Sequence, residues 1–599
     1  MIFKFLPLLI RDRISHYGTK AALGFKDNTL NAWSTISWNQ MGERIDAVAK
    51  ALLNEGINEQ GMVGIFSANM PEWILSDFAL MSIRAVSIPI FATDPLIQVE
   101  YIIRETEMQL IFVGEQEQYD KILKIAEKNK LDIKIVVFED RVDLRNYPKA
   151  VYYKQFYGKW IDDKDNSALN ERLSNLDTED IATILYTSGT TGEPKGVVLR
   201  QKNFDSFLKI HTAYLTVLTE KDTTLAFLPL SHIFERAMTI FALHKGATIY
   251  FLTNPRSVVD ALKEVRPTFM CTVPRFFEKT YNVIFEKIEA SSTIQKKIFD
   301  WAIGVGGKVM NLRRLEQTIP LVDSIKYAIA DKLVLQQGRQ AFGGNIRYMP
   351  CSGSKLPDEI NIFFQSAGIH IIYAYGLTET LATVTAYPYT HFKFGTVGKP
   401  LPFVEVKIGK DNEILIKDDS LFTEYYKKPV ETLAAYEDGW FKSGDAGEID
   451  EDGNLIMLDR IKDLIKTSVG KYVAPQQIEC VLASEPLIEQ VVVIGDDRKF
   501  LTALIVPSFS ALEVYAEKLK ITFASREEML SNSLIVKLMK ARLHAVQKNL
   551  ANYQKVQKFT MLAHEFSIDT GEFTSTLKMK RKIISEKYRH LIEKMYLEV

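Results

Sequence analysis

The segment best suited to hold an anion is residues 186–196, a run of small and hydroxylated side chains. Its glycines allow positive φ and let the backbone approach a ligand closely. Its hydroxyl groups add hydrogen-bond donors, and a lysine adds a positive charge. Such a loop can form a cradle for a triphosphate. The residues concerned are Thr187, Ser188, Gly189, Thr190, Thr191, Gly192 and Lys195.

This loop differs from two common nucleotide-binding loops. A P-loop needs glycine directly before its lysine and Ser or Thr after it, whereas Pro194 precedes Lys195 here and Gly196 follows. No G-x-G-x-x-G pattern opens a helix after the first strand, so a dinucleotide site is not favoured. The alternative that stays open from these residues alone is a mobile surface loop rich in Ser, Thr and Gly.

Strands and helices alternate around this loop, which predicts parallel βαβ units with helices on both faces of the sheet. Residues 141–179 are polar and are expected to be irregular, and residues 280–340 are expected to be helical. Expected strands are 62–67, 86–91, 109–113, 133–138, 181–186, 224–227, 248–252 and 268–273; expected helices are 73–83 and 119–130, with others beginning at 234 and 258.

The pattern changes at about residue 459, where a lysine-rich stretch leads to a smaller segment. Residues 490–495 and 501–507 predict two strands joined by a polar turn, and helices with a basic tail follow. We therefore expect an N-terminal domain of residues 1–461 and a C-terminal α+β domain of residues 462–599.

Composition excludes several classes of protein. The 599 residues carry a net charge of −1, so the chain offers no overall basic field for nucleic acid. Three distant cysteines and nine scattered histidines predict neither a disulfide framework nor a zinc site, as in an intracellular protein. No apolar run is long enough to cross a membrane. The short apolar stretch at residues 1–10 is interpreted as a first helix on the core, with a peripheral membrane anchor as the alternative.

The loop at residues 186–196 resembles the signature of the acyl-adenylate-forming superfamily, which includes acyl-CoA synthetases, luciferases and peptide-synthetase adenylation domains. Four further segments resemble motifs of this family in the same order along the chain. They are 228–236, 373–380, 438–447 with 459–463, and 574–578. One such match could arise by chance, whereas five in order cover most of the chain. The resemblance implies an α/β fold with a large domain of mostly parallel sheets flanked by helices and a small, mobile C-terminal domain.

The resemblance also implies a site for ATP and Mg²⁺. Glu379 would bind Mg²⁺ with a hydroxyl of Thr187 or Ser188, since a hard cation prefers oxygen ligands. Asp445 would accept the ribose hydroxyls, and Arg460 would contact the ribose or a phosphate. The alternative interpretation is that Glu379 is a solvated surface carboxylate and that Asp445 is an aspartate in a turn. The nucleotide pocket would also include Gly353, Tyr375 stacked on adenine, Gly376 and Thr378; Ser352 replaces a glycine that is frequent in the family.

The family's catalytic lysine matches Lys578, which would stabilise negative charge as a carboxylate attacks the α-phosphate. The alternative is that Lys578 is only one of several lysines in a basic tail. In addition, Leu577 precedes it where the family usually has glycine. Lys462 would be the hinge about which the small domain rotates. Gly470 would then line a channel for CoA. Lys466 would contact phosphate or CoA, with a solvated lysine as the alternative.

The acid is predicted to be a long-chain fatty acid, because residues 229–236, 274–279 and 470–475 and the helical stretch 280–340 resemble long-chain fatty acyl-CoA synthetases. His232 would lie at the wall of the acyl pocket without acid–base work, since the carboxylate is already ionised at pH 7. Alternatives are a ligase for an aryl, branched or medium-chain acid, a ligase that feeds a carrier protein, and a non-catalytic binding protein.

The predicted partners are a fatty acid, ATP and CoA, without nucleic acid. The predicted location is the cytoplasm. Peripheral association with the inner face of the membrane stays open, as does the choice between monomer and homodimer.

Overall fold

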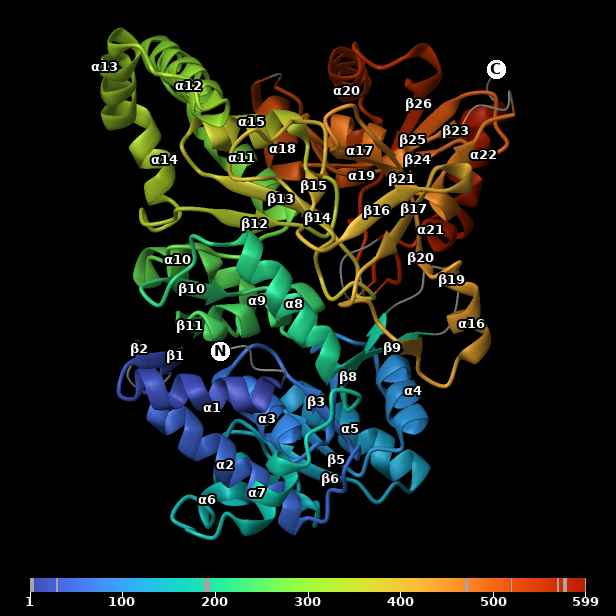
Figure 1. The fold of residues 1–599 in the computed structure, drawn as a ribbon. Helices are drawn as coiled ribbons and strands as arrows, with labels where there is room; N and C mark the ends of the chain where they lie inside the picture. The colour runs from blue at the N-terminus through green and yellow to red at the C-terminus, as the bar shows by residue number, and fades with distance from the viewer. Residues whose placement is uncertain are drawn as a thin grey trace.

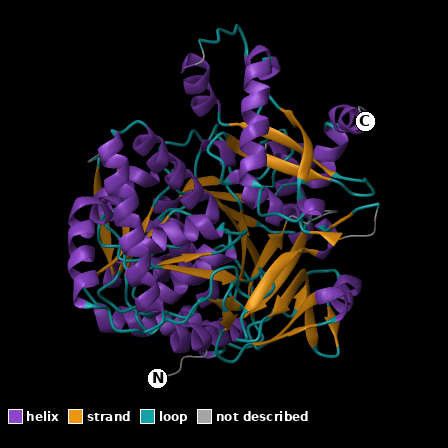
Figure 2. Cartoon of the chain, turned by 90° about the horizontal axis from the view of Figure 1, so that it is seen from above, coloured by secondary structure: helices purple, strands orange, loops and turns teal. Residues whose placement is uncertain are grey.

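The computed structural model describes residues 5–27, 31–187, 194–468, 472–518, 520–567, 570–574 and 579–597. Its strands lie in the interior and its helices mostly outside them (Figure 2). The N-terminal end of the chain forms the lower part of the molecule in Figure 1, and the C-terminal segment lies at the upper right.

The largest sheet has eight strands. The six from β8 to β7 are parallel, and β9 and β18 are added at the β8 edge by antiparallel pairing. Helices α1, α2 and α3 belong to the core on one face and α4 and α5 to that on the other, as the alternating pattern predicted. In order, the strands are β18 (Glu424–Tyr425), β9 (Lys195–Arg200), β8 (Ile181–Thr187), β4 (Val86–Ile90), β3 (Met62–Phe66), β5 (Leu110–Val113), β6 (Lys134–Val137) and β7 (Ala150–Tyr152); the helices are α1 (Leu6–Tyr17), α2 (Trp38–Asn54), α3 (Pro71–Ser82), α4 (Leu96–Thr106) and α5 (Gln116–Asn129).

The first helix, α1, rests on the protein core, which confirms the expectation for the N-terminal apolar stretch. Leu6, Leu9 and Ile10 are each 2% exposed, and the backbone N–H of Leu6 donates to Gln201 Oε1 at 3.3 Å. Across the described part of the chain, no helix combines the length and apolar character that a membrane span requires.

Two smaller sheets are each parallel in part and antiparallel at one edge. The first consists of β10 (Thr223–Ala226), β11 (Thr248–Phe251), β1 (Ala21–Asp27) and β2 (Ala32–Ser37), with α8 (Gln201–Tyr214), α9 (Ile233–His244) and α10 (Val258–Val265) nearby in the chain; the second consists of β12 (Met349–Cys351), β13 (Ile371–Tyr375), β14 (Thr385–Ala386) and β15 (Lys399–Pro400), with α15 (Asp358–Ser366).

The predicted strand at 268–273 is wrong, because this segment makes only isolated bridges. Phe269 bridges Thr224 and Tyr348, and Thr272 bridges Cys351, so the segment links the two small sheets instead of joining either. The polar stretch 141–179 is also more regular than expected: it contains β7, α6 (Tyr153–Gly158) and α7 (Ser167–Ser174). Tertiary contacts override its weak local pattern, since Tyr153 and Phe156 are buried in the core.

The helical stretch expected at 280–340 is confirmed and projects at the upper left of Figure 1. It comprises α11 (Pro274–Glu289), α12 (Thr293–Arg314), α13 (Leu321–Ala330), the π-helical turn η2 (Asp331–Leu335) and α14 (Gln336–Gln340).

A wholly antiparallel sheet, which sequence patterns did not predict, occupies residues 405–460. It is formed by β16 (Glu405–Ile408), β17 (Glu413–Lys417), β20 (Trp440–Ile449), β19 (Tyr436–Glu437) and β21 (Leu455–Arg460), with α16 (Pro429–Ala434) beside it in the chain.

The C-terminal segment has its own core, which starts at Ile465, whereas the large cores end at Leu455. The C-terminal segment therefore packs around a core separate from that of the rest of the chain. Strands β24 and β25 form the expected antiparallel hairpin, and β26 adds in parallel. The elements are β22 (Ile465–Lys466), β23 (Tyr472–Val473), α17 (Pro475–Ala483), β24 (Ile488–Ile494), β25 (Leu501–Pro507), α18 (Phe509–Lys518), α19 (Arg526–Ser531), α20 (Ser533–Val546), β26 (Val556–Met561), α21 (Arg581–Lys587) and α22 (Arg589–Leu597).

Candidate active site

The candidate phosphate loop joins two paired strands, β8 and β9. Thr187 ends β8, Lys195 begins β9, and the two residues face each other in the ladder. The hydroxyl of Thr187 donates to the carbonyl oxygen of Lys195 at 3.4 Å. This pairing fixes both ends of the loop. Its middle lies outside the described residues, and with it the predicted Ser188, Gly189, Thr190, Thr191 and Gly192.

Tyr425 connects the loop to the predicted magnesium ligand. It lies on β18, which pairs with β9, and the Lys195 ammonium sits 4.8 Å from the centre of its ring. Its hydroxyl donates to Glu379 Oε1 at 2.9 Å. Burial, and then the charge of Glu379, raise the pKa of Tyr425, so the hydroxyl keeps its proton and remains a donor. Tyr425 therefore holds the Glu379 carboxylate beside the loop.

Sequence reasoning did not single out Tyr425. It lies 46 residues after Glu379 and between the motifs used for the resemblance. A tyrosine at the end of a two-residue strand has no spacing relative to Glu379 that would reveal the contact.

A second group of contacts joins Tyr375, Asp445 and Arg460. Tyr375 ends β13 and donates its hydroxyl to Asp445 Oδ2 at 2.7 Å. Asp445 is 1% exposed, and Arg460 Nε lies 3.6 Å from its Oδ1. Burial, followed by the Asp445 charge, raises the pKa of Tyr375 well above its ordinary value. The carboxylate predicted to bind ribose is thus held between a neutral donor and a cation.

The ladder between β20 and β21 explains how Asp445 and Arg460 meet. They are direct cross-strand partners in this antiparallel pair, although fifteen residues separate them in sequence. Ser443 fixes the local backbone, since its Oγ accepts from the Asp445 N–H at 3.1 Å. The antiparallel sheet therefore positions the predicted ribose site.

Two predicted glycines occupy positions that need glycine. A Cβ on Gly376 would lie 1.7 Å from the Ala382 carbonyl oxygen, so any side chain would force this turn apart. Gly353 has φ +100°, in the left-handed region. Thr378 lies in the same turn as Gly376, and its carbonyl accepts the Leu381 N–H at 3.2 Å. These residues shape the backbone between Tyr375 and Glu379.

Together these contacts form one continuous path. Lys195 touches Tyr425, Tyr425 binds Glu379, and the short 375–379 segment leads to Tyr375 and Asp445. The structure thus brings the loop ends, the predicted magnesium ligand and the predicted ribose pair into one region, although they are spread over residues 187–460.

The predicted acyl-site residue His232 precedes α9 and is half-buried. Its Nδ1 accepts the Phe234 N–H at 3.2 Å, as a helix cap, and its ring meets Phe91 edge-on at 6.3 Å. The capping bond occupies one ring nitrogen in a structural role. This arrangement agrees with an imidazole that orients the pocket wall without acid–base work.

A buried ion pair anchors α9 to β8, the strand that leads into the candidate phosphate loop. Arg236 binds both carboxylate oxygens of Asp77, at 3.0 and 2.5 Å, and donates to Thr183 Oγ1 at 2.7 Å. Both charged side chains are fully buried. A buried charge is costly unless paired, so this bidentate pair ties α9 firmly to α3 and β8.

The small domain contacts the large one at several points. The Asp459 carboxylate at the end of β21 accepts the Gln476 N–H at the start of α17 at 2.9 Å, and burial raises its pKa to about 6. Arg275 of α11 pairs with Glu489 of β24, and Cys480 Sγ lies 3.7 Å from the Lys355 carbonyl oxygen. The small domain is therefore seated over the turn that contains Gly353.

The predicted hinge and CoA residues lie near this junction. Lys462 is exposed in a single 3₁₀ turn (Ile461–Asp463) between the two domains. Lys466 is exposed, and its N–H donates to Asp496 Oδ1 at 3.1 Å. Gly470 and Lys578 lie outside the described residues, and Lys578 is flanked by the bridge between Phe573 and Met579.

Comparison with known proteins gives consistent matches. Residues 10–426 match the family described as AMP-binding enzyme, and residues 462–599 match the AMP-binding enzyme C-terminal domain. A long-chain-fatty-acid–CoA ligase from Mycobacterium bovis is 33% identical over 577 residues, which cover 94% of this chain and 92% of that protein. A long chain acyl-CoA synthetase of Arabidopsis thaliana is 29% identical, with 98% and 91% covered.

Solved structures share the fold. The adenylation domain of a carboxylic acid reductase from Segniliparus rugosus matches with a TM-score of 0.76 at 18% identity, covering 99% of this chain and 94% of that one. A benzoate CoA ligase from Burkholderia xenovorans matches with a TM-score of 0.70 at 18% identity, covering 97% and 99%. At this identity the likeness shows the fold alone, and it confirms a large N-terminal domain with a smaller C-terminal one.

Proposed function

Since the chain belongs to the AMP-binding enzyme family, we propose that it is an AMP-forming ligase that joins long-chain fatty acids to CoA. The acid class is supported by long-chain ligases that are 27–33% identical over nearly the whole chain. The main support for the site is the continuous series of contacts that leads from Lys195 through Tyr425 and Glu379 to Tyr375 and Asp445.

In the first half-reaction a carboxylate oxygen of the fatty acid attacks the α-phosphorus of ATP. A new O–P bond forms, the bond to the β-phosphate breaks, and pyrophosphate leaves. Asp445 and Arg460 hold the ribose, which fixes the α-phosphorus relative to the loop. Lys195 and Lys578 supply positive charge where negative charge gathers between the two anions, and Thr187 adds a hydroxyl donor.

The residues present suit a Mg²⁺ ion bound together with the phosphates. Tyr425 fixes Oε1 of the half-buried Glu379 and orients the carboxylate beside the ends of the loop, which are Thr187 and Lys195. Mg²⁺ in such sites is held by one or two carboxylates, substrate phosphates and water, not by an all-protein cage. The described ranges hold no cluster of three or more His, Cys, Asp or Glu side chains. Bound there, the ion would neutralise phosphate charge.

In the second half-reaction the CoA thiol, as its thiolate, attacks the acyl carbonyl carbon and AMP leaves. We place the domain boundary at residue 461 and the hinge at Lys462, so that rotation of residues 462–599 exchanges Lys578 for a channel lined by Gly470. Lys466 contacts a phosphate in that channel. The junction suits such a rotation, because a single 3₁₀ turn, in which Lys462 is exposed, separates two cores.

We further propose that the enzyme works in the cytoplasm, at the inner face of the membrane. Cys271, Cys351 and Cys480 are free thiols, as in proteins of reducing compartments. A long-chain acid is apolar over most of its length and partitions into bilayers, so the substrate is reached at that surface.

Product analysis tests the reaction and the acid class together. The purified protein is incubated with MgATP, CoA and either palmitate, benzoate or cinnamate, and thioester and AMP are quantified. We expect AMP-coupled thioester from palmitate. Thioester from an aryl acid alone would replace the long-chain assignment with a ligase for aryl acids, and acyl-AMP without thioester would indicate transfer to a carrier protein.

The role of Lys578 is tested by separating the half-reactions. Lys578→Ala should abolish acyl-AMP formation from acid and ATP, yet retain much of the thioester formation from supplied acyl-AMP. Lys580→Ala, in the same basic segment, serves as the matched control and should retain both. Equal loss of both half-reactions in the Lys578 variant would rule out the assigned role.

A further inference from the structure

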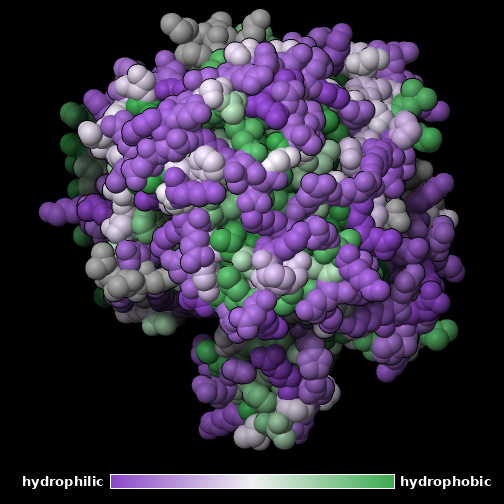
Figure 3. All heavy atoms as spheres, turned by 90° about the horizontal axis from the view of Figure 1, so that it is seen from below, coloured by the Kyte–Doolittle hydropathy of each residue, from purple (hydrophilic) through white to green (hydrophobic). Residues whose placement is uncertain are grey.

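The helical arm formed by α12 to α14 carries an unusual concentration of exposed apolar side chains. Among the described residues, 25 large hydrophobic side chains are exposed, and nine of them lie between Ile294 and Leu333. By contrast, the lower face of the molecule is mostly hydrophilic, with hydrophobic residues scattered over it (Figure 3). The arm therefore differs from the ordinary surface of this protein.

Five of these nine side chains belong to α13 and to the π-helical turn that continues it. Their exposed fractions range from 50% to 77%. At 3.6 residues per turn, positions four apart lie on one stripe, so they form a single row along the outer face of the helix. The row consists of Leu321, Ile325, Ile329 and Leu333, and Val322 is exposed beside it.

The inner face of α13 is anchored, so the row is presented on a firm support. Lys308 of α12 pairs with the buried Asp323 at 2.7 Å. Ala330 and Leu335 form a small core with Ala302 of α12. The outer row is thus left uncovered while the helix itself is packed, and it does not result from a poorly packed helix.

Positive charge accompanies the row. Lys326 and Lys332 are exposed on either side of it, and residues 293–340 contain eight Lys and Arg against four Asp and Glu. This local excess contrasts with the net charge of −1 of the whole chain. An apolar stripe bordered by lysines is the pattern of helices that lie in the interface of an anionic bilayer.

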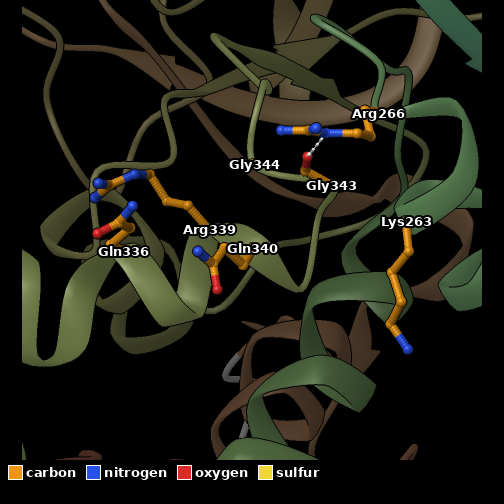
Figure 4. Close-up of a pocket in the computed structure, with 7 residues that line it drawn as sticks. All are labelled: Lys263, Arg266, Gln336, Arg339, Gln340, Gly343 and Gly344. Atoms are coloured by element: carbon orange, nitrogen blue, oxygen red, sulfur yellow. Dashed lines mark hydrogen bonds between the residues drawn. The ribbon is translucent and has the colours of Figure 1, made fainter.

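A cleft at the foot of the arm adds further cationic groups. It has a volume of about 420 Å³ and lies between α10 and α14, on the same side of the molecule as α13 (Figures 1 and 4). In Figure 4 the Arg266 side chain extends across it toward α14, with Nε bonded to the Gly343 carbonyl oxygen at 3.0 Å. Arg339 on the other wall is paired with Asp331 at 2.7 Å. The lining is Lys263, Arg266, Gln336, Arg339, Gln340, Gly343 and Gly344, which includes three basic residues and no acidic one.

We infer that the outer face of α13 docks this protein on an anionic phospholipid surface, with the apolar row among the acyl chains and the cleft facing phosphate headgroups. The inference rests on the proposed function, because a long-chain acid partitions into that surface. It names the docking surface, which the reaction chemistry does not require.

A second copy of the chain fits this face less well. In a two-fold pairing of α13 with itself, an axis through the middle of the row would set Lys326 against its own copy. Like charges opposed in this way destabilise an apolar interface. Anionic headgroups instead complement the lysines on both sides of the row.

Vesicle co-sedimentation tests the inference with the full chain. Vesicles of phosphatidylcholine alone are compared with vesicles that also contain phosphatidylglycerol. The wild type should bind the anionic vesicles, and binding should weaken as salt increases. Ile325→Ser with Ile329→Ser should weaken binding by about tenfold or more, and Lys326→Gln with Lys332→Gln by about fivefold per charge. Arg266→Gln should also reduce binding.

The matched control is Val430→Ser with Leu433→Ser on α16, where both side chains are 76% and 80% exposed but lie outside the arm. It should bind vesicles as the wild type does. Equal binding by the apolar variant, or equal losses in variant and control, would overturn the inference. A change of oligomeric state in light scattering without a change in vesicle binding would replace the lipid surface with a second copy.

Activity separates this inference from the proposed function. The apolar variant should turn over octanoate, which is soluble, at the wild-type rate and palmitate presented in vesicles more slowly. An equal rate with vesicle-borne palmitate would contradict docking for catalysis. If the wild type forms no thioester from any acid, the proposed function fails, whereas vesicle binding is measured independently.

Discussion

Replacement of Asp445 by Asn is the sharpest test of the nucleotide site, because the change keeps the shape of the side chain and removes its charge. Asp445 is 1% exposed and accepts the Tyr375 hydroxyl at 2.7 Å, with Arg460 Nε 3.6 Å from its other oxygen. Asn retains an acceptor for Tyr375. The variant should therefore fold and lose chiefly its interaction with the ribose.

The magnitude follows from the change in hydrogen-bond strength. A bond to a charged group contributes about 1.5–3 kcal/mol, and a neutral one about 0.5–1.5 kcal/mol. Two ribose hydroxyls on a neutral acceptor would then lose about 2 kcal/mol together, which corresponds to about a 30-fold increase in the KM for ATP. Tyr375→Phe removes only the supporting donor and should cost about 1 kcal/mol, or about fivefold.

The assay is steady-state thioester formation with ATP varied at saturating acid and CoA, then with the acid varied. Glu448→Gln is the matched control, since Glu448 is an exposed carboxylate on the same strand. The KM for ATP should rise in the Asp445 variant while the KM for the acid stays constant. If the KM for ATP stays within about twofold of the control, or if both KM values rise together, Asp445 does not bind the ribose.

Three further outcomes are expected. Glu379→Gln keeps an acceptor for Tyr425 but removes a cation ligand, so the Mg²⁺ concentration for half-maximal activity should rise about tenfold; an unchanged requirement would contradict the role. Burial raises the pKa of Glu235 well above its ordinary value, so its contribution to stability is present below the unfolded pKa and is lost as pH rises. As pH rises from 5 to 7, the wild type should lose stability relative to Glu235→Gln in urea unfolding, and parallel curves would refute this. Burial lowers the pKa of His211 to about 4, so its contribution is present above pH 6.5 and is lost as pH falls. His211→Gln should therefore lose about 3 kcal/mol less than the wild type between pH 7 and 4, and equal losses would contradict a buried neutral imidazole.

Sequence reasoning identified the ends of the phosphate loop, Glu379, Asp445 and Arg460, and the structure places them in one region. The motifs could be read because each is a short run whose residue types carry chemistry by themselves. Asp445 and Arg460 lie on consecutive strands, and pairing of these strands in a hairpin makes them partners. The contact between Tyr375 and Asp445 could not be predicted, because 70 residues and two different sheets separate them.

Errors arose where local pattern and tertiary pairing disagree. Residues 268–273 are apolar enough for a strand, yet they touch two sheets at single residues and complete neither. Three strands of the antiparallel sheet, β16, β17 and β19, have only four, five and two residues, so their periodicity was too weak to predict a sheet. Strands β17, β20 and β21 pair in an antiparallel ladder, and this pairing holds Asp445 in place.

The sequence by itself determined the α/β class, the two-part division and the chemical groups of the site, because helix and strand periods and glycine-rich loops are local properties of the chain. Only the tertiary structure decided which distant side chains meet. It placed Tyr425 between Lys195 and Glu379, and it left the outer face of α13 uncovered. An apolar stripe in a sequence looks the same whether it faces a core or solvent. The difference depends on what packs against it, and that is a property of the whole fold.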